Sequence, residues 1–80
     1  MEEALSRIET FPEVCGGEPR IAGTRIPVWL LVRARQLGTS EAEILRAYSS
    51  LRAEDLTSAW AYHHDHPDEI ERQIRDNEAA

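Results

Sequence analysis

Residues 15–28 read Cys-Gly-Gly-Glu-Pro-Arg-Ile-Ala-Gly-Thr-Arg-Ile-Pro-Val, and this stretch decides the fold. Its first half is a turn cluster of two glycines and Pro19, because glycine admits a positive φ and proline ends the element before it. Its last two residues, Pro27 and Val28, open a helix, since the missing N–H of proline costs nothing in a first helical turn. The residues ahead of the cluster, 5–14, predict one short strand followed by a loop. The chain should therefore change from β-structure to α-helix at Pro27.

Between these points the sequence predicts a tight β-hairpin over residues 20–27. Gly23-Thr24 supplies the two-residue loop, with glycine at the first central position, as a type II′ turn requires. This register places Ile21 opposite Ile26, so that the two isoleucines share one face of the hairpin. The arginines of the segment then project from the other face. We expect a hairpin with an apolar underside and a cationic top.

Downstream of Pro27, apolar residues recur at helical spacing and predict four helices. Their expected ranges are 28–37, 41–47, 52–64 and 68–78. Gly38 ends the first helix, and Ser40 with Glu43 makes a capping box for the second. The expected buried positions are Leu30, Leu31, Ala34 and Leu37 in the first helix, Ile44, Leu45 and Tyr48 in the second, and Leu56, Ala59, Trp60 and His63 in the third.

The expected fold class is mainly α, with a trihelical, homeodomain-like helix-turn-helix core, a short strand and β-hairpin before it, and an extra C-terminal helix. A chain of 80 residues has room for one domain. We divide it into an N-terminal strand and hairpin (1–27), the trihelical core (28–65) and an acidic C-terminal helix (66–80). Because so small a core is marginally stable alone, we expect a homodimer.

The composition indicates a folded domain, with 41% hydrophobic and 30% charged residues. No apolar run is long enough to span a bilayer, and the first residues lack the basic region of a secretory signal. Cys15 is the single cysteine, so that an intramolecular disulfide is impossible. We therefore expect a cytoplasmic protein with no membrane role.

The formal net charge of −6 opposes non-specific binding to nucleic acid, but the charges are unevenly spread. Residues 19–40 hold four arginines and no acid, whereas residues 67–80 hold five acids and two arginines. The candidate DNA-binding residues are Arg20, Arg25, Arg33 and Arg35 for phosphate contacts, and Arg52, Thr57 and Ser58 in the third helix for base edges. Glu54 and Asp55 in that helix would repel phosphates. The alternative is that the arginines form a solvated surface.

The acidic C-terminal helix has a thin apolar stripe of Ile70 and Ile74, which would become firmly helical only against a partner. Arg72 and Arg75 lie on the same helix and suit contacts to carboxylates. Trp29 falls away from the expected stripe of the first helix, so that it either packs under the hairpin or anchors a partner. These five are the candidate partner-binding residues.

Catalysis and metal binding are not expected. Cys15 and a histidine could pair as nucleophile and base, but a chain of 80 residues has little room for a substrate pocket as well. His63 and His64 point about 100° apart on a helix and do not both face one ion, and His66 adds no standard zinc spacing. We expect no enzyme, no cofactor and no small-molecule substrate.

Residues 15–28 resemble the family called domain of unknown function 433. The likeness continues through Leu37-Gly38-Thr39-Ser40, Glu43-Ile44-Leu45, Tyr48, Leu51, Glu54-Asp55-Leu56 and Ala59. The resemblance implies a short β-region before a trihelical core. It also implies the antitoxin half of a type II toxin–antitoxin pair, similar to VapB proteins, with a PIN-like ribonuclease as the toxin. Such antitoxins insert an arginine among the acids of the nuclease site, for which Arg72 and Arg75 are the candidates.

Three functions stay open at this point. The first is an antitoxin whose C-terminal helix occupies a toxin and whose dimerised core binds operator DNA. The second is a stand-alone DNA-binding regulator without a protein partner. The third is a protein-interaction module without DNA binding, which the net charge of −6 favours.

One departure from the family matters here, because Arg52 replaces the usual Thr or Ser before the third helix and removes a side-chain cap.

Overall fold

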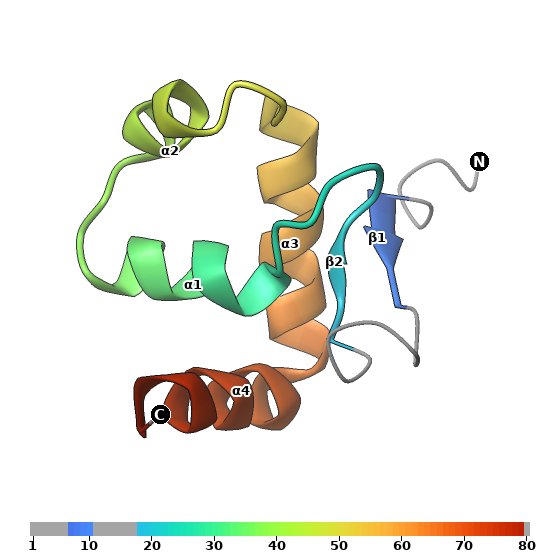
Figure 1. Cartoon of the computed structure of the whole chain (residues 1–80), viewed down its shortest axis with the longest axis vertical. Helices are drawn as coiled ribbons and strands as arrows, with labels where there is room; N and C mark the ends of the chain where they lie inside the picture. The colour runs from blue at the N-terminus through green and yellow to red at the C-terminus, as the bar shows by residue number, and fades with distance from the viewer. Residues whose placement is uncertain (1–6, 11–17, 80) are drawn as a thin grey trace.

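The computed structural model describes residues 7–10 and 18–79 as a mainly helical domain with a small antiparallel sheet. Its elements are β1 (Ile8–Glu9), β2 (Arg20–Ile21), α1 (Val28–Gln36), α2 (Glu41–Ala47), α3 (Ala53–Asp65) and α4 (Pro67–Ala79). Figure 1 shows α1 between α2 and α4, with α3 running along the side of all three. The expected fold class, mainly α with N-terminal β-structure and an extra C-terminal helix, is confirmed.

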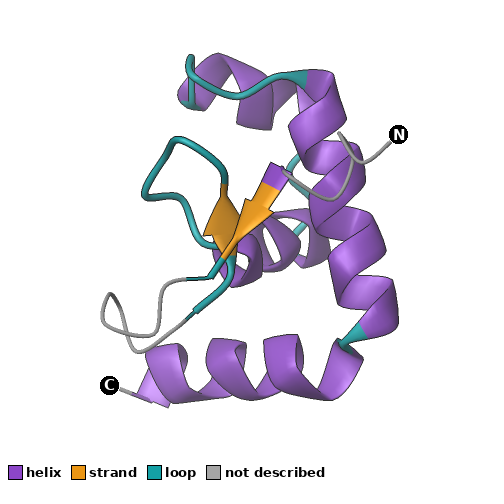
Figure 2. Ribbon diagram, turned by 90° about the vertical axis from the view of Figure 1, so that its right-hand side faces the viewer, coloured by secondary structure: helices purple, strands orange, loops and turns teal. Residues whose placement is uncertain are grey.

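The strand expected near the N-terminus is present as β1, and it pairs antiparallel with β2. Ile8 lies opposite Ile21 and Glu9 opposite Arg20, and Figure 2 shows the two strands side by side in front of the helices. Most of the strand and loop expected over residues 5–14 lies outside the described residues, as does the turn cluster with Cys15.

The chain folds back after β2 in the predicted register. Arg20 lies opposite Pro27, and the Ile21 N–H donates a hydrogen bond of 2.9 Å to the Ile26 carbonyl. Ile21 is fully buried, and Ile26 packs against the core from a partly buried position. The apolar underside of the hairpin is therefore confirmed for both isoleucines.

The expected type II′ turn is wrong. The Thr24 N–H donates to the Ile21 carbonyl at 3.0 Å, so Ala22 and Gly23 are the central residues of the turn. Gly23 comes second of these two and has a φ of 77°. A type II turn requires a positive φ at that position, and the chain places its glycine there.

Helix α1 begins after Pro27, as predicted, and Gly38 follows its end with a φ of 95°. The predicted inward face is partly wrong. The buried residues of α1 are Val28, Leu31 and Val32. Leu37 is 68% exposed, because the helix ends at Gln36 and the buried positions follow the i, i+3, i+4 spacing from Val28.

The capping box predicted for α2 is confirmed. Ser40 Oγ accepts a hydrogen bond from the Glu43 N–H at 3.1 Å, and Glu43 Oε1 accepts one from the Ser40 N–H at 3.0 Å. Ile44, Leu56 and Ala59 are buried, whereas the other expected inward residues of α2 and α3 are partly buried. The partly buried residues are Leu45, Tyr48, Trp60 and His63.

Helix α4 packs on α1 and completes the core. Ile70 is 0% exposed and Ile74 4%, so both belong to the same hydrophobic cluster as Leu31 of α1. The expectation that these two isoleucines dock on a partner is therefore wrong. The thin apolar stripe of α4 packs against the apolar side of α1 within the same chain.

Candidate functional site

The first turns of α3 carry a buried acid that the sequence places on the surface. Asp55 is 6% exposed and accepts two hydrogen bonds of 2.9 Å, from Arg7 Nη1 to Oδ1 and from the Arg52 N–H to Oδ2. It thereby caps the helix in place of the side-chain acceptor that Arg52 does not offer. The expectation that Asp55 repels phosphates is wrong, because its charge is turned inward and paired with Arg7.

The outer surface of the same turns is formed by the residues predicted to read bases. Arg52 and Thr57 are exposed, Ser58 is half-buried, and Glu54 is the exposed acid between them. The Thr57 hydroxyl donates to the Ala53 carbonyl of its own helix at 3.3 Å. This surface therefore offers one cation, two hydroxyl groups and one acid.

The four arginines of residues 19–40 do not gather on one face. Arg33 forms an ion pair with Glu78 of α4, and Arg35 lies 4.6 Å from the centre of the Trp60 ring of α3. Arg25 is exposed in the turn after β2, and Arg20 is half-buried in β2 itself. The acid-free segment is thus partly neutralised by α4, which the sequence pattern does not reveal.

Both tryptophans are held within the chain. Trp29 packs against the core from a partly buried position and donates from Nε1 to Glu18 Oε1 at 3.2 Å. Trp60 donates from Nε1 to Glu41 Oε2 at 2.8 Å. Of the two alternatives for Trp29, the structure supports packing beside the β-region.

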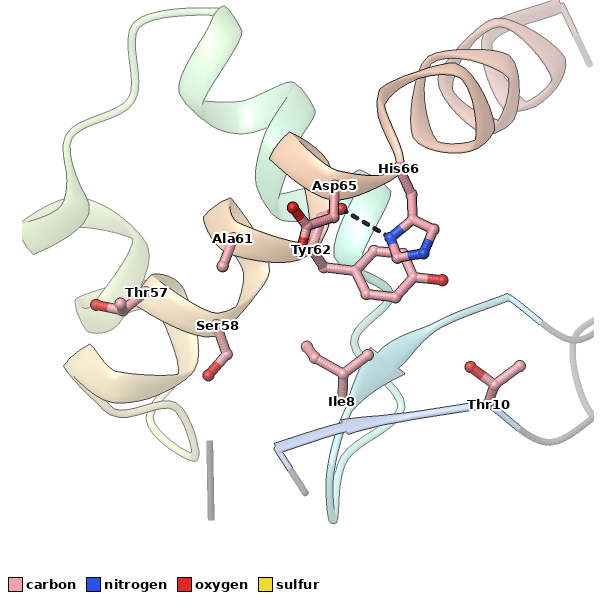
Figure 3. Close-up of a pocket in the computed structure, with 8 residues that line it drawn as sticks. All are labelled: Ile8, Thr10, Thr57, Ser58, Ala61, Tyr62, Asp65 and His66. Carbon is pink, nitrogen blue, oxygen red and sulfur yellow. Dashed lines mark hydrogen bonds between the residues drawn. The ribbon is translucent and has the colours of Figure 1, made fainter. Parts of the chain in front are cut away.

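A groove of about 370 Å³ lies between β1 and the outer side of α3 (Figure 3). It is lined by Ile8, Thr10, Thr57, Ser58, Ala61, Tyr62, Asp65 and His66. Sequence reasoning missed this groove, because the position of β1 beside α3 depends on contacts between distant residues. The small side chains at one side of α3 are its only signal in the sequence.

Aromatic rings close one end of the groove. The rings of Tyr62 and His66 stack with their centres 4.1 Å apart, and the Tyr62 hydroxyl donates to Glu69 Oε1 at 2.9 Å. Burial raises the pKa of Tyr62 from 10.0 to about 12, and the hydrogen bond and the charge of Glu69 act in the same direction. The phenol is therefore a neutral hydrogen-bond donor at ordinary pH.

The outer face of α4 carries the two remaining partner candidates, since Arg72 and Arg75 are both exposed. His63 of α3 and His66, which follows the end of that helix, have different neighbours. His63 Nε2 lies 2.9 Å from Glu71 Oε2, which also accepts from Gln36 at 3.1 Å, whereas His66 stacks on Tyr62.

None of the helices in the described ranges is long and apolar enough to cross a membrane.

These observations define a class of protein, namely a small, mainly helical domain with a short antiparallel sheet at its N-terminal side. The family described as "Protein of unknown function (DUF433)" matches residues 8–63, and the chain belongs to this family. A crystal structure of a DUF433 member protein from Anabaena variabilis is similar, with a TM-score of 0.86 and 46% sequence identity. The match covers 92% of this chain and 73% of that chain.

A protein of Sinorhizobium fredii, the "Uncharacterized protein y4eO", is 34% identical over 55 residues. The matched segment is 69% of this chain and 25% of that protein. The matched part of the chain thus covers about a quarter of the length of this relative.

Proposed function

We propose that the chain is a non-enzymatic, antitoxin-like regulator that binds operator DNA as a dimer through α3 and neutralises a PIN-like ribonuclease. The observation that carries the DNA-binding part is the surface of the first turns of α3. Arg52, Thr57 and Ser58 lie on this surface, and Asp55 is turned away from it. A helix-turn-helix protein places such a surface in the major groove, where hydroxyl groups and arginine reach base edges.

The arrangement of the first three helices supports the same proposal. α2 and α3 are joined by residues 48–52, and α1 packs against both of them. Two short helices joined by a tight turn are the unit that DNA-binding regulators use. The family resemblance, which implies a VapB-like role, adds the toxin partner.

The overall charge fixes how such binding would behave. At a formal net charge of −6, the chain gains little from general attraction to phosphate, so binding rests on a few contacts. With about three phosphates neutralised, the logarithm of the binding constant would fall with the logarithm of salt concentration with a slope of about −3.

A gel-shift titration against the promoter fragment upstream of the gene tests the DNA-binding part. Arg52→Ala and Thr57→Ala should each weaken binding about five- to tenfold, the loss of one base or phosphate contact. Arg46→Ala, which removes an exposed arginine of α2, is the control and should retain most of the affinity. Absence of a complex even at low salt would exclude DNA binding and favour the protein-interaction module.

The toxin-binding part rests on the outer face of α4. Ile70 and Ile74 are buried, so contact to a toxin would be polar and would use Arg72 and Arg75. Arginine forms bidentate pairs with carboxylates, which are the metal-binding groups of a PIN-like nuclease.

The test is to co-express the chain with the product of the adjacent gene and to measure the ribonuclease activity of the purified complex. Arg72→Ala combined with Arg75→Ala should relieve the inhibition while leaving the gel shift intact. If the two proteins do not associate, the toxin part of the proposal is wrong, and the stand-alone regulator is favoured.

A further inference from the structure

Strand β1 has one paired edge and one open edge. The Ala22 N–H donates to the Arg7 carbonyl at 2.7 Å, and Ile8 lies opposite Ile21. Because successive residues of an antiparallel strand point their backbone groups to opposite edges, the amide and carbonyl of Ile8 point away from β2. No residue in ranges 7–10 and 18–79 forms a hydrogen bond with them.

The other edge of the sheet is occupied. The Ile21 N–H donates to the Ile26 carbonyl at 2.9 Å, so the returning segment covers the side of β2 that faces away from β1. Within the described part of the chain, β1 therefore provides the open edge of the sheet. Such an edge readily pairs with a strand from another molecule.

The sequence of β1 is complementary to itself when two copies lie antiparallel. If Ile8 lies opposite Ile8 of a second copy, Arg7 of each copy lies opposite Glu9 of the other, and within its own chain Arg7 keeps its hydrogen bond to Asp55 through Nη1. Opposite charges that face each other across strands stabilise the pairing, and like charges weaken it. The outward amide and carbonyl of Ile8 would exchange two hydrogen bonds with those of the second copy.

The groove lies on the face of β1 that carries the Ile8 side chain, and it leaves space there for a side chain of the added strand. It measures about 370 Å³, and Figure 3 shows the Ile8 side chain pointing from β1 toward α3. Side chains of directly opposite residues lie on the same face of a sheet, so Ile8 of the second copy would point to the same side. Ala61 and the Tyr62 ring, which line the groove, offer apolar contacts there.

We propose that the chain forms a two-fold symmetric homodimer by antiparallel pairing of β1 with β1 of a second copy, centred on Ile8. The two sheets of two strands would join into one continuous sheet. The interface is self-complementary, as two-fold symmetry requires. Thr57 and Ser58, which the proposed function places against DNA, also line this groove, so this interface is separate from that of the DNA-bound dimer. The proposal rests on β1 alone and does not depend on DNA or toxin binding.

Disulfide trapping of the full chain tests the register. In a Cys15→Ser background, Ile8→Cys should give a disulfide-linked dimer on mild oxidation, because opposite Cα atoms about 5.5 Å apart lie within disulfide range. Thr10→Cys is the matched control. Two residues further along antiparallel strands, its Cα atoms would be roughly 13 Å apart and should not cross-link. Equal cross-linking of both variants, or none of Ile8→Cys, would overturn the proposal.

Sedimentation equilibrium of the full chain without DNA tests the charge pairing. Glu9→Arg places arginine opposite arginine twice and should raise the dimer dissociation constant at least about tenfold. Asp76→Arg changes an exposed residue of α4, alters the net charge equally and should leave the constant unchanged. A wild-type monomer, or equal constants for the two variants, would contradict this interface. A dimer that binds no operator would instead contradict only the DNA-binding part of the proposed function.

Discussion

Asp55 joins two segments that are 48 residues apart, since Arg7 from the N-terminal side reaches its carboxylate at the start of α3. The position of Asp55 as the third residue of α3 follows from the sequence, and its hydrogen bond to the Arg52 N–H is a local capping contact. The contact with Arg7 is different, because the sequence near Asp55 does not specify which distant arginine will bind its carboxylate. The charge of Asp55, which the sequence analysis expected to oppose DNA binding, therefore has a structural role.

Asp55→Ala should lower the free energy of unfolding by about 1–3 kcal/mol, because it removes a helix cap and leaves Arg7 without its carboxylate. Urea unfolding followed by circular dichroism gives the value. Glu54→Ala, at the exposed neighbouring position, should change the same quantity by less than about 0.5 kcal/mol. Equal effects of the two substitutions would show that the buried contacts of Asp55 contribute little.

Tyr62 makes the stability depend on pH in the alkaline range. Its pKa is raised to about 12 in the folded chain, chiefly by burial, from 10.0. Between these two values the unfolded chain loses the phenolic proton and the folded chain keeps it, so the free energy of unfolding should fall as pH rises. Urea unfolding at several pH values should show a smaller fall for Tyr62→Phe than for the wild type. Identical curves for wild type and Tyr62→Phe would contradict the role of Tyr62.

At the scale of the elements, local signals placed the helices well and their faces less well. The predicted range of α2 is identical to the observed one, and the ends of the other three differ by at most one residue. Caps and glycines lie within a few residues of the ends they determine, so the sequence contains that information directly. Which side of α1 is buried depends on α3 and α4, and Leu37 shows the resulting error.

Helix α4 is the clearest case, because its two isoleucines were expected to dock on a partner and are instead buried in the core of the chain. Ile70→Ala should reduce the free energy of unfolding by about 2–5 kcal/mol, since it leaves a cavity at a fully buried position. Arg72→Ala, exposed two residues further along, should cost less than about 0.5 kcal/mol. Chemical denaturation measures both values, and a mild effect of Ile70→Ala would mean that α4 is held loosely.

At the scale of the whole molecule, the sequence predicted the order and type of the elements but not the surfaces they form together. The two groups of charges that looked separate, the arginines of residues 19–40 and the acids of α4, meet in the ion pair of Arg33 with Glu78. The groove between β1 and α3 also depends on distant contacts. Of the candidate residues, Arg52, Thr57, Arg72 and Arg75 lie on the surface as a binding role requires, whereas Ile70 and Ile74 do not.

A single core predicts a single cooperative unit. Amide hydrogen exchange should give Ile74 of α4 and Leu31 of α1 closely similar protection, set by unfolding of the entire chain. Nuclear magnetic resonance resolves the two amides individually. Exchange of the Ile74 amide orders of magnitude faster would indicate that α4 detaches while the other helices stay folded.

The packing of α4 shows that the family match and the hydrophobic core end at different residues. The family match ends at residue 63, but Ile70 and Ile74, which lie beyond it, pack against the apolar side of α1. A fragment trimmed to the motif would expose that side to water and tend to aggregate. A protein fragment that contains this motif therefore needs either α4 or another apolar surface to cover α1.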